Sequence, residues 1–541
     1  MKTTNQTELN RRSFLKLAGM SALGMAASPS VAQDPKPRRP NIAIILADDL
    51  GFSDIGCYGG EIDTPNLDRL AAAGLRFTQF YNTGRCWPTR AAIMTGYYPQ
   101  QIRMDPAKGR LPKAVRLMPH FLAPAGYRNY HSGKWHVNGA PLPVKDGGFD
   151  RSFVLHDHDR FFSPRNMVLD DRRLPPVTDS PGYYTTSAIA DYGIDFLKEH
   201  HANHRDKPFF LYLAFTTPHF PLHALQEDID HYRTRYLEGW DKIRRQRFER
   251  LRAEGIIDCD LSKPEPQTIP KWNLPEKDLH ERIGPGEAGH AVPWTDLSDE
   301  QRRFQATKMA IHAAMVHRMD RDIGRVLDQI KAMNAHEDTL VFFLSDNGAS
   351  AEQIIRGDGH DPAAAPGSAA SYLCLGPGWS TAANTPFRLH KSWVHEGGIA
   401  TPLIVHWPKG IAARGALRHT TGHCIDFVPT LLDLLKIDPP KTWNDLEPPA
   451  LPGRSLLPAF AQDRQIKRDF FFFSHINNRA LRVGDYKLVR TQADADWSLY
   501  NLAKDRDESE NLAQKLPDKV KEMADLWLEL NTRFQTESQA P

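Results

Sequence analysis

The sequence predicts an α/β fold: a large domain built on a central, mostly parallel sheet, followed by a smaller C-terminal α+β subdomain with a short antiparallel sheet. Two uninterrupted apolar runs, residues 41–46 and 339–344, have the pattern of strands buried on both faces. Apolar side chains at three- and four-residue spacing between 304 and 330 predict a long helix that packs one face on that sheet. Short strands separated by turn residues after residue 458 predict the antiparallel sheet.

Length and composition limit the class of protein. At 541 residues the chain is longer than one hydrophobic core normally serves, so a second domain or an appendage is expected. The hydrophobic share of 40% and the charged share of 25% are ordinary for a soluble globular protein. A net charge of +2 offers no footprint for nucleic acid. Five cysteines, an odd number, argue against a disulfide framework and leave at least one free thiol.

Residues 1–32 are expected to be a signal peptide. Residues 11–16 read RRSFLK, a twin-arginine export motif, and an apolar stretch and a small-residue cleavage site at 30–32 follow it. The alternative, a transmembrane anchor, does not fit, because the apolar run is short and interrupted by Gly and Ser. We therefore expect export by the twin-arginine translocase to the periplasm or beyond, with no stable membrane anchor. Residues 33–40 form a proline-rich spacer.

Two strand ends carry candidate metal ligands. The run 41–46 leads into Asp48 and Asp49, and the run 339–344 leads into Asp346 and Asn347. Either pair alone could be a solvated turn. Two matching pairs on buried strands instead favour a ligand site at one sheet edge, where open α/β folds bind ligands. An all-oxygen donor set suits Ca²⁺ or Mg²⁺ rather than Zn²⁺.

The stretch 84–96, GRCWPTRAAIMTG, contains a candidate nucleophile. Pro88 suits the first turn of a helix, so a helix is expected over 89–95 with Cys86 just before it. Unpaired N–H groups at a helix N-terminus favour an anion, which Cys86 and Arg90 would then face. An isolated cysteine would more often be a small buried apolar residue.

Three further segments place cationic or proton-donating groups near expected strand ends. Lys134 and His136 follow 126–133 and lie on one side if that segment is extended. His219 follows the strand 208–215, and Lys391 precedes the strand 402–408. Taken singly, each histidine would ordinarily be structural and Lys391 would be solvated.

The remaining segments are expected to be decoration or scaffold. Residues 146–181 and 225–297 look like variable insertions, and the charge runs of the second are expected on solvated helix faces. The long helix begins at Ser298, where Gln301 completes a capping box. Beyond 458 we expect strands at 469–473, 480–483 and 486–490 and a helix over 517–534. The predicted domains are therefore 41–457, which is catalytic, and 458–541.

Taken together, these motifs resemble the type I sulfatases of the alkaline-phosphatase-like superfamily. The pattern Cys-x-Pro-x-Arg followed by Ala-Ala-x-Met-Thr-Gly resembles the family signature, in which the cysteine becomes formylglycine. The segments Gly-Lys-Trp-His, Thr-Pro-His and Ser-Asp-Asn-Gly match in the same order, and the resemblance runs from about residue 41 to 512. It implies a large α/β/α sandwich. Trp87 departs from the smaller residue that the family often has.

The resemblance also implies roles for the candidate residues. One Ca²⁺, preferred to Mg²⁺, would be held by Asp48, Asp49, Asp346, Asn347 and the modified Cys86, and Arg90 would position the formylglycine hydrate. Lys134, His136, His219 and Lys391 would surround the sulfate, with Lys134, His219 and Lys391 binding the substrate. One hydroxyl of the hydrate would attack sulfur while His219, helped by Lys391, protonates the leaving oxygen. The second hydroxyl, deprotonated by a base such as His136, would then expel sulfate.

A maturation enzyme is implied as a partner, and a sulfated glycan is expected as the natural substrate. Specificity is expected from residues 146–181, 225–297 and 475–479. Two other functions stay open at this point. One is a phosphonate or phosphate ester hydrolase of the same superfamily, and the other is a sulfated-glycan-binding protein whose Cys86 is never modified.

Overall fold

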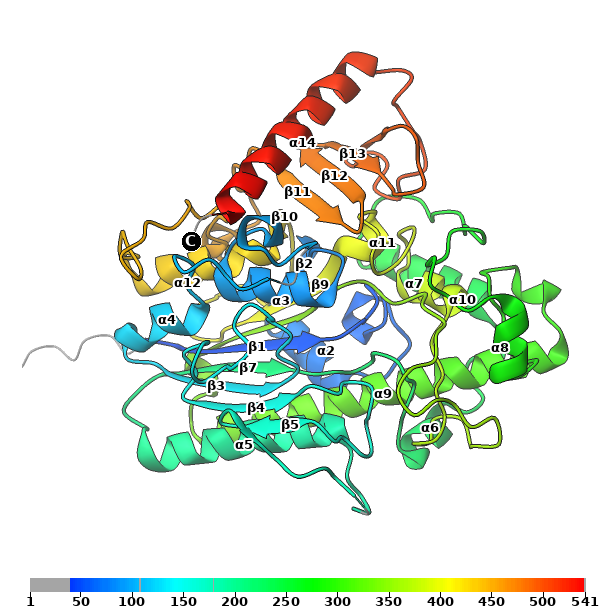
Figure 1. Ribbon diagram of the computed structural model, residues 1–541, viewed down its shortest axis with the longest axis horizontal. Coiled ribbons are helices and arrows are strands. Elements are labelled where there is room, and N and C mark those ends of the chain that lie inside the picture. Colours follow the sequence, from blue (N-terminus) through cyan, green and yellow to red (C-terminus); the bar gives the residue numbers. More distant parts are fainter. Residues whose placement is uncertain (1–38, 107–108, 179, 540–541) are drawn as a thin grey trace, which may run out of the picture. The chain divides into compact units, whose positions relative to one another are not determined.

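The computed structural model describes residues 39–106, 109–178 and 180–539, and residues 40–539 of that part belong to one compact unit (Figure 1). The predicted signal peptide and most of the spacer lie outside the described residues. No helix of the described part is long and apolar enough to cross a membrane. All five cysteines are free, which confirms that no disulfide framework supports the fold.

A ten-stranded sheet forms the centre of the large domain. The strand order is β10 (Ala416–His423), β2 (Leu75–Tyr81), β9 (Ala400–His406), β8 (Thr339–Ser345), β1 (Asn41–Ala47), β7 (Phe209–Ala214), β3 (Arg128–Gly133), β4 (Arg151–Leu155), β5 (Met167–Leu169) and β6 (Arg172–Arg173). The five neighbours from β8 to β4 are mutually parallel, as predicted, while β9, β5 and β6 pair antiparallel.

Helices cover both faces of this sheet, because β1 is buried along its whole length and needs apolar partners on each side. Ile42, Ile44 and Leu46 belong to one core, and the alternating Ala43 and Ile45 belong to the other. The first face packs against α3 (Cys86–Thr95), α4 (Met118–Leu122) and α12 (Phe427–Leu435), and the second against α2 (Pro65–Ala72), α5 (Thr185–Asn203) and α9 (Asp299–Ala332) (Figure 1).

The helix predicted from Ser298 is α9. Ser298 is its N-cap, and Gln301 donates its backbone N–H to the Ser298 hydroxyl at 3.1 Å, which confirms the capping box. The other helices of the large domain are α6 (Gln226–Tyr232), α7 (Trp240–Ala253), α8 (Glu276–Arg282), α10 (Pro377–Ala383), α11 (Glu396–Ile399) and α13 (Leu457–Ala461).

The C-terminal subdomain is a four-stranded antiparallel sheet covered by one helix. The strands are β11 (Phe471–His475), β12 (Asn478–Val483), β13 (Tyr486–Arg490) and β14 (Ser498–Asn501), paired in that order. The helix α14 (Pro517–Ser538) stacks Trp527 on Phe472 with ring centroids 5.4 Å apart. The sequence predicted three of these strands and the helix, and it missed β14.

Two expectations about the insertions need correction. Residues 146–181 are not only loop, because β4, β5 and β6 extend the central sheet there. The charge run on α7 is not wholly solvated either. Arg247 is completely buried and pairs with Asp54 at 2.8 Å and Glu61 at 2.8 Å, and Arg244 is 5% exposed. Buried guanidinium groups require such partners, which come from distant parts of the chain.

Candidate active site

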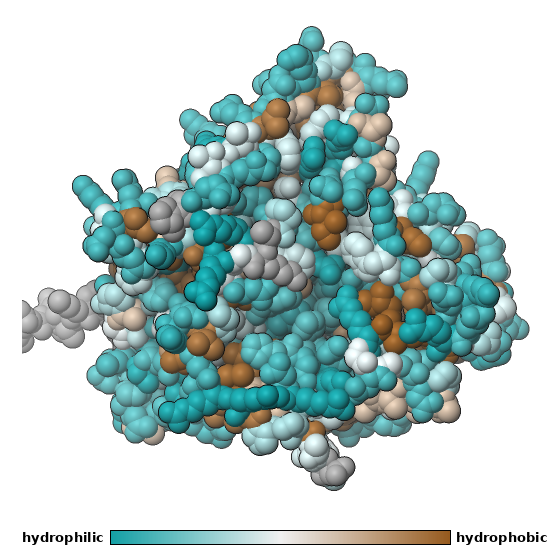
Figure 2. Space-filling view, viewed as in Figure 1, coloured by the Kyte–Doolittle hydropathy of each residue, from teal (hydrophilic) through white to brown (hydrophobic). Residues whose placement is uncertain are grey.

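Four adjacent parallel strands bring the predicted site residues to one sheet edge. In the order β8, β1, β7, β3, they end immediately before Asp346, Asp48, the segment leading to His219, and Lys134. Parallel strands align their carboxyl ends, so residues more than 200 positions apart in sequence become neighbours there. The space-filling view shows a hollow with mainly hydrophilic walls near the middle of the side of the molecule that is drawn (Figure 2).

The predicted metal ligands lie in contact with one another. Asn347 Nδ2 donates to Asp49 Oδ1 at 2.7 Å, and the Asp49 backbone N–H donates to Asp346 Oδ1 at 3.3 Å. Asp49 turns away from the strand direction with φ of 66°, a left-handed conformation that Asp tolerates better than most residues. That turn lets both acids after β1 face the cluster.

The donor set fits a hard cation on the evidence of its unsatisfied oxygens. Asp48 Oδ1 and Asn347 Oδ1 are buried and have no hydrogen-bond partner. Burial and the neighbouring Asp48 carboxylate raise the pKa of Asp346 to about 7, and burial raises that of Asp49. Buried acids without enough partners are costly, and a divalent cation would relieve both the repulsion and the missing contacts.

Cys86 lies beside these acids. Its sulfur and carboxylate oxygens of Asp48 and Asp346 lie within 4.8 Å of one another. Cys86 is the first residue of α3 rather than the residue before it, and Arg85 is the N-cap. Arg90, one turn later, donates from Nε at 3.0 Å and from Nη2 at 2.7 Å to Asp346 Oδ2. The signature helix therefore attaches its candidate nucleophile to the acid cluster through a fully buried Arg–Asp pair.

Two lysines and a histidine contact the same acids. Lys134 Nζ donates to Asp48 at 2.6 Å, and Lys391 Nζ donates to Asp49 at 2.8 Å. His219 Nε2 lies 3.7 Å from Asp49, and its Nδ1 lies 2.5 Å from the Phe220 carbonyl oxygen, which requires the proton on Nδ1. Burial and the positive charges of Lys391 and Lys134 hold the pKa of His219 well below its usual value. All three predicted residues thus lie in the cluster.

His136 differs from expectation in its backbone. The segment is not extended beyond Gly133, and His136 has φ of 52°, so the simple two-residue alternation with Lys134 does not apply. Its ring lies 6.0 Å from that of Trp87 and 5.9 Å from that of His158. Trp87 directly follows Cys86, and the His158 ring packs on that of His219, so His136 lies next to residues of the site.

Sequence reasoning missed two residues of the site. His158 lies in the segment 146–181 and packs edge-on against His219, with centroids 4.8 Å apart. Burial and the Lys134 ammonium lower its pKa. Glu352 is 2% exposed and lies 3.1 Å from Lys391 Nζ, and it also accepts from Trp272 Nε1 at 2.8 Å. The pair of histidines at 156 and 158 was a weak signal for the first, and only the fold could have indicated the second.

The comparison with family models agrees with this geometry. The model of the sulfatase family matches residues 40–437, and that of the C-terminal region of N-sulphoglucosamine sulphohydrolase matches residues 387–539. The chain therefore belongs to the sulfatase family and is a sulfuric ester hydrolase.

Two curated relatives support that assignment. An uncharacterized sulfatase of Schizosaccharomyces pombe is 31% identical over 91% of this chain and 93% of its own length. The arylsulfatase of Klebsiella aerogenes is 32% identical over 78% of this chain and 93% of its own length. The N-acetylgalactosamine-6-sulfatase of Rattus norvegicus is more distant, at 27% identity over 88% of this chain and 75% of its own.

Solved structures confirm the fold. The crystal structure of Ps i-CgsB has a TM-score of 0.64 at 22% identity and covers 93% of this chain and 94% of its own. A structure in complex with its substrate D-glucosamine-2-N,6-O-disulfate has a TM-score of 0.62 at 20% identity and covers 92% of this chain and 99% of its own.

Proposed function

We propose that this sulfatase removes sulfate from a sulfated carbohydrate, with a formylglycine made from Cys86 as nucleophile and one Ca²⁺ held by the acid cluster. The observation that carries this proposal is the position of the Cys86 sulfur within 4.8 Å of carboxylate oxygens of Asp48 and Asp346. Buried unsatisfied oxygens of Asp48 and Asn347 beside it support a cation with oxygen ligands.

The formylglycine and the Ca²⁺ would supply chemistry that the other side chains of the site lack. A bound divalent cation neutralises charge on an anionic ester and favours loss of a proton from a hydroxyl beside it. Hydrated formylglycine offers one hydroxyl to attack sulfur and a second whose deprotonation releases sulfate. A plain Cys has only a thiol and a plain Ser has only one hydroxyl, so neither offers the second hydroxyl that this release requires.

The side chains of the cluster would bind and orient the sulfate. Lys134 and Lys391 flank the acids from two sides and are 1% and 2% exposed, so their charge acts in a site with little water. Arg90 is already committed to Asp346, and its role is to fix α3 against the cluster. Glu352 holds Lys391 from the side opposite Asp49.

His219 is the best-placed group to protonate the leaving oxygen. Burial and the positive charges of Lys391 and Lys134 hold the pKa of His219 low. A sulfate ester between Lys134 and Lys391 would offset both positive charges and so favour the protonated imidazole. We propose His136, whose ring lies 6.0 Å from that of Trp87, as the base that would regenerate the aldehyde by taking the proton of the second hydroxyl as sulfate leaves.

The substrate class rests on relatives and on solved neighbours. Several curated relatives are N-acetylgalactosamine-6-sulfatases, and one neighbour was solved with a sulfated glucosamine and another with k-i-k-neocarrahexaose. These names support a sulfated carbohydrate as the substrate of this chain and specify no particular sugar.

A substrate panel tests the proposal. Protein made with a formylglycine-generating enzyme is assayed for release from an aryl sulfate, sulfated mono- and oligosaccharides, an aryl phosphate and an aryl phosphonate. We expect sulfate release from the aryl sulfate and from at least one saccharide, with much slower turnover of the phosphorus esters. Faster phosphorus-ester turnover would favour the hydrolase alternative, and glycan binding without release would favour the binding protein.

Chelation tests the cation separately. We expect treatment with a chelator to lower the thermal transition temperature, because repulsion among Asp48, Asp49 and Asp346 is then unrelieved. Ca²⁺ should restore it more fully than Mg²⁺. An unchanged transition with full activity after complete chelation would contradict a cation at this site.

We also propose export through the twin-arginine pathway, from the RRSFLK motif alone. Replacing both arginines (Arg11→Lys with Arg12→Lys) should retain the protein in the cytoplasm, as measured by cell fractionation. Unchanged export of that variant would rule out the twin-arginine route.

A further inference from the structure

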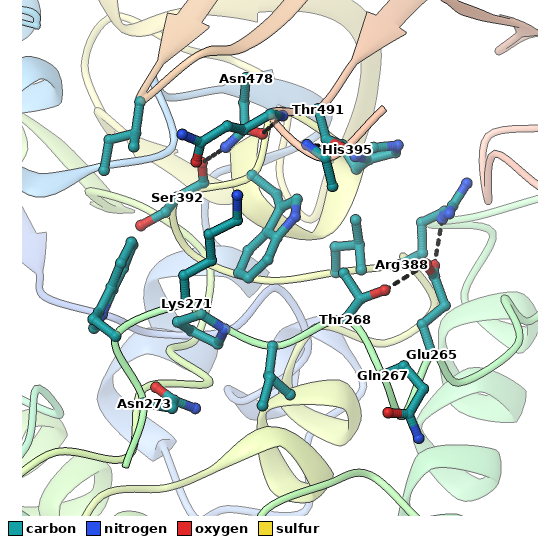
Figure 3. Close-up of a pocket in the computed structure, with 18 of the residues that line it drawn as sticks. Glu265, Gln267, Thr268, Lys271, Asn273, Arg388, Ser392, His395, Asn478 and Thr491 are labelled. Carbon is teal, nitrogen blue, oxygen red and sulfur yellow. Dashed lines mark hydrogen bonds and ion pairs between the residues drawn. The ribbon is translucent and has the colours of Figure 1, made fainter. Parts of the chain in front are cut away.

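A cavity of about 560 Å³ lies beside the candidate active site (Figure 3). Its walls come from five parts of the chain: residues 265–276, residues 289–290, residues 388–395, residues 476–478 and residues 491–500. The first part belongs to the insertion 225–297, and Ile476 and Asn478 belong to the segment 475–479. Both segments are those from which specificity is expected.

The cavity shares walls with the catalytic cluster. Trp272 lines the cavity and donates its indole N–H to Glu352 Oε1 at 2.8 Å, and the other oxygen of Glu352 lies 3.1 Å from Lys391 Nζ. Ser392 lines it too, next in sequence to Lys391, and accepts from Arg85 Nη1 at 2.7 Å. Arg85 directly precedes Cys86. The cavity is therefore separated from the sulfate-binding lysine by one layer of side chains.

The lining combines aromatic faces with groups that form hydrogen bonds. Trp272 is 39% exposed, and its ring is held in position because Glu352 accepts from the indole N–H and the Arg85 guanidinium lies over the ring, 5.8 Å from its centroid. Trp393 is a second aromatic side chain of the lining. In Figure 3 the Lys271 side chain extends into the middle of the cavity, and Lys271 makes no ion pair among the described residues. Glu265, by contrast, is occupied by Arg388 at 2.6 Å.

From this arrangement we infer that the cavity is a binding subsite for the sugar unit next to the sulfated one, which makes the enzyme selective for oligosaccharides. The inference rests on the proposed function. A sugar ring has apolar C–H faces and a rim of hydroxyl groups, which match aromatic platforms and converging polar groups. The volume lies within the range of small-molecule pockets and is ample for one ring.

Lys271 is the residue of the subsite whose contribution to binding can be predicted most directly. Its ammonium group offers three donors and no competing carboxylate holds it, so it is expected to bind hydroxyl oxygens or an acidic substituent of the neighbouring sugar. Either a carboxylate or a second sulfate on that sugar would pair with the Lys271 ammonium. Comparing the turnover of a uronate-containing oligosaccharide with that of a doubly sulfated one distinguishes these two substituents.

The test compares kcat/KM for a sulfated oligosaccharide with kcat/KM for a small aryl sulfate, in the mature enzyme. We expect Lys271→Ala to lower the ratio of the two about tenfold, the effect of losing one charge-assisted hydrogen bond. Thr268→Trp, which adds bulk to the lining three residues away on the same wall, should lower the ratio as well. Lys277→Ala on α8 is the matched control, because that lysine is 81% exposed and outside the lining, and its ratio should equal that of the wild type.

The outcomes separate the subsite from the reaction. Sulfate release from all substrates with an unchanged ratio in Lys271→Ala and Thr268→Trp would overturn the subsite while leaving the sulfatase intact. No release from any substrate by the wild type would overturn the proposed function itself. Equal loss on the aryl sulfate and the oligosaccharide in both variants would also overturn the subsite, since it indicates damage to the catalytic cluster.

Discussion

Cys86 combines two properties that rarely occur in one residue: it starts a helix, and its sulfur lies among carboxylates. Among the described residues, no other cysteine forms such a group with two carboxylates, and burial raises the pKa of both Cys259 and Cys374 to about 12. The helix N-terminus adds a partial positive potential at this position, which favours an anionic group. The role that we propose for position 86 therefore rests on its position in the fold, not on the thiol alone.

We predict that Cys86→Ala abolishes sulfate release with little change in the fold. The side chain is small and 4% exposed, so its truncation removes few contacts. Circular dichroism and the thermal transition check the fold, and sulfate release checks activity. Measurable sulfatase turnover by this variant would refute the nucleophile assignment.

Glu352 is predicted to be a positioning residue. Its carboxylate and that of Asp49 hold Lys391 between them at 3.1 and 2.8 Å. Glu352→Gln removes one of the two negative partners, and we expect kcat/KM for an aryl sulfate to fall about tenfold. The fall should appear in KM more than in kcat if Lys391 mainly binds sulfate, and unchanged kinetics would exclude the role.

At the scale of elements, the loop after β1 is tied to two helices through Asp54. Asp54 accepts from Arg247 on α7 at 2.8 Å and lies 3.0 Å from His312 Nε2 on α9. This loop begins with the candidate metal ligands Asp48 and Asp49, so the ion pairs of Asp54 help to hold these acids in position. Burial alone would raise the pKa of Asp54, but His312 and Arg247 outweigh it and lower the pKa to about 2.

A pH dependence of stability follows from that lowered pKa. The group contributes on the order of 2 kcal/mol, fully present above its ordinary pKa of 3.8 and lost as the pH falls toward 2. We expect Asp54→Asn to lower the free energy of unfolding at pH 6 and to lose less stability than the wild type between pH 4 and pH 2. Denaturant titrations at these pH values measure both.

The control is Glu249→Gln, an exposed position on α7, the helix that carries Arg247. Its stability should match that of the wild type at each pH. Identical acid sensitivity of Asp54→Asn and the wild type would show that other groups govern stability in this range.

Sequence alone located the elements with a strong pattern and missed those that depend on the tertiary structure. The apolar runs that become β1 and β8 are buried throughout, so their signal was complete. β4 (RSFVL), β5 (MVL) and β6 (RR) lie at the sheet margin and are too short to show a periodic pattern of polar and apolar residues. Arg247 appeared as surface charge because its partners Asp54 and Glu61 lie nearly 200 residues away.

The site shows the same division. Each predicted ligand followed a recognisable strand end or motif, and the structure brings them together. His158 and Glu352 follow no such motif. His158 enters the site through packing on His219, and Glu352 through its contact with Lys391. Neither contact can be inferred from sequence spacing.

For the whole molecule, the C-terminal subdomain shares a core with the catalytic domain. Phe472, Leu481 and Trp527 belong to the same apolar cluster as Met94 and Phe427. Buried ion pairs also cross the predicted boundary at 457–458, which itself stays a prediction. Glu396 on α11 accepts from Lys487 at 2.9 Å and from Arg506 at 3.0 Å.

We predict that a chain ending at residue 457 does not fold into a stable enzyme. It would expose the shared core and leave the buried Glu396 carboxylate without its cations, a loss of several kcal/mol. The chain 33–541 is the reference, and soluble yield and cooperative thermal unfolding are the readouts. Cooperative unfolding of the truncated chain near the temperature of the reference would contradict the shared-core account.

The measurement that tests the central claim most directly is mass spectrometry of the tryptic peptide 86–90, from active protein made with a maturation enzyme. Trypsin releases this peptide because Arg85 precedes it and Arg90 ends it. The account predicts an aldehyde at position 86, with the sulfur replaced by oxygen and two hydrogens lost, or its hydrate, which carries one further water. An intact thiol at position 86 in protein that fully retains sulfatase turnover would contradict it.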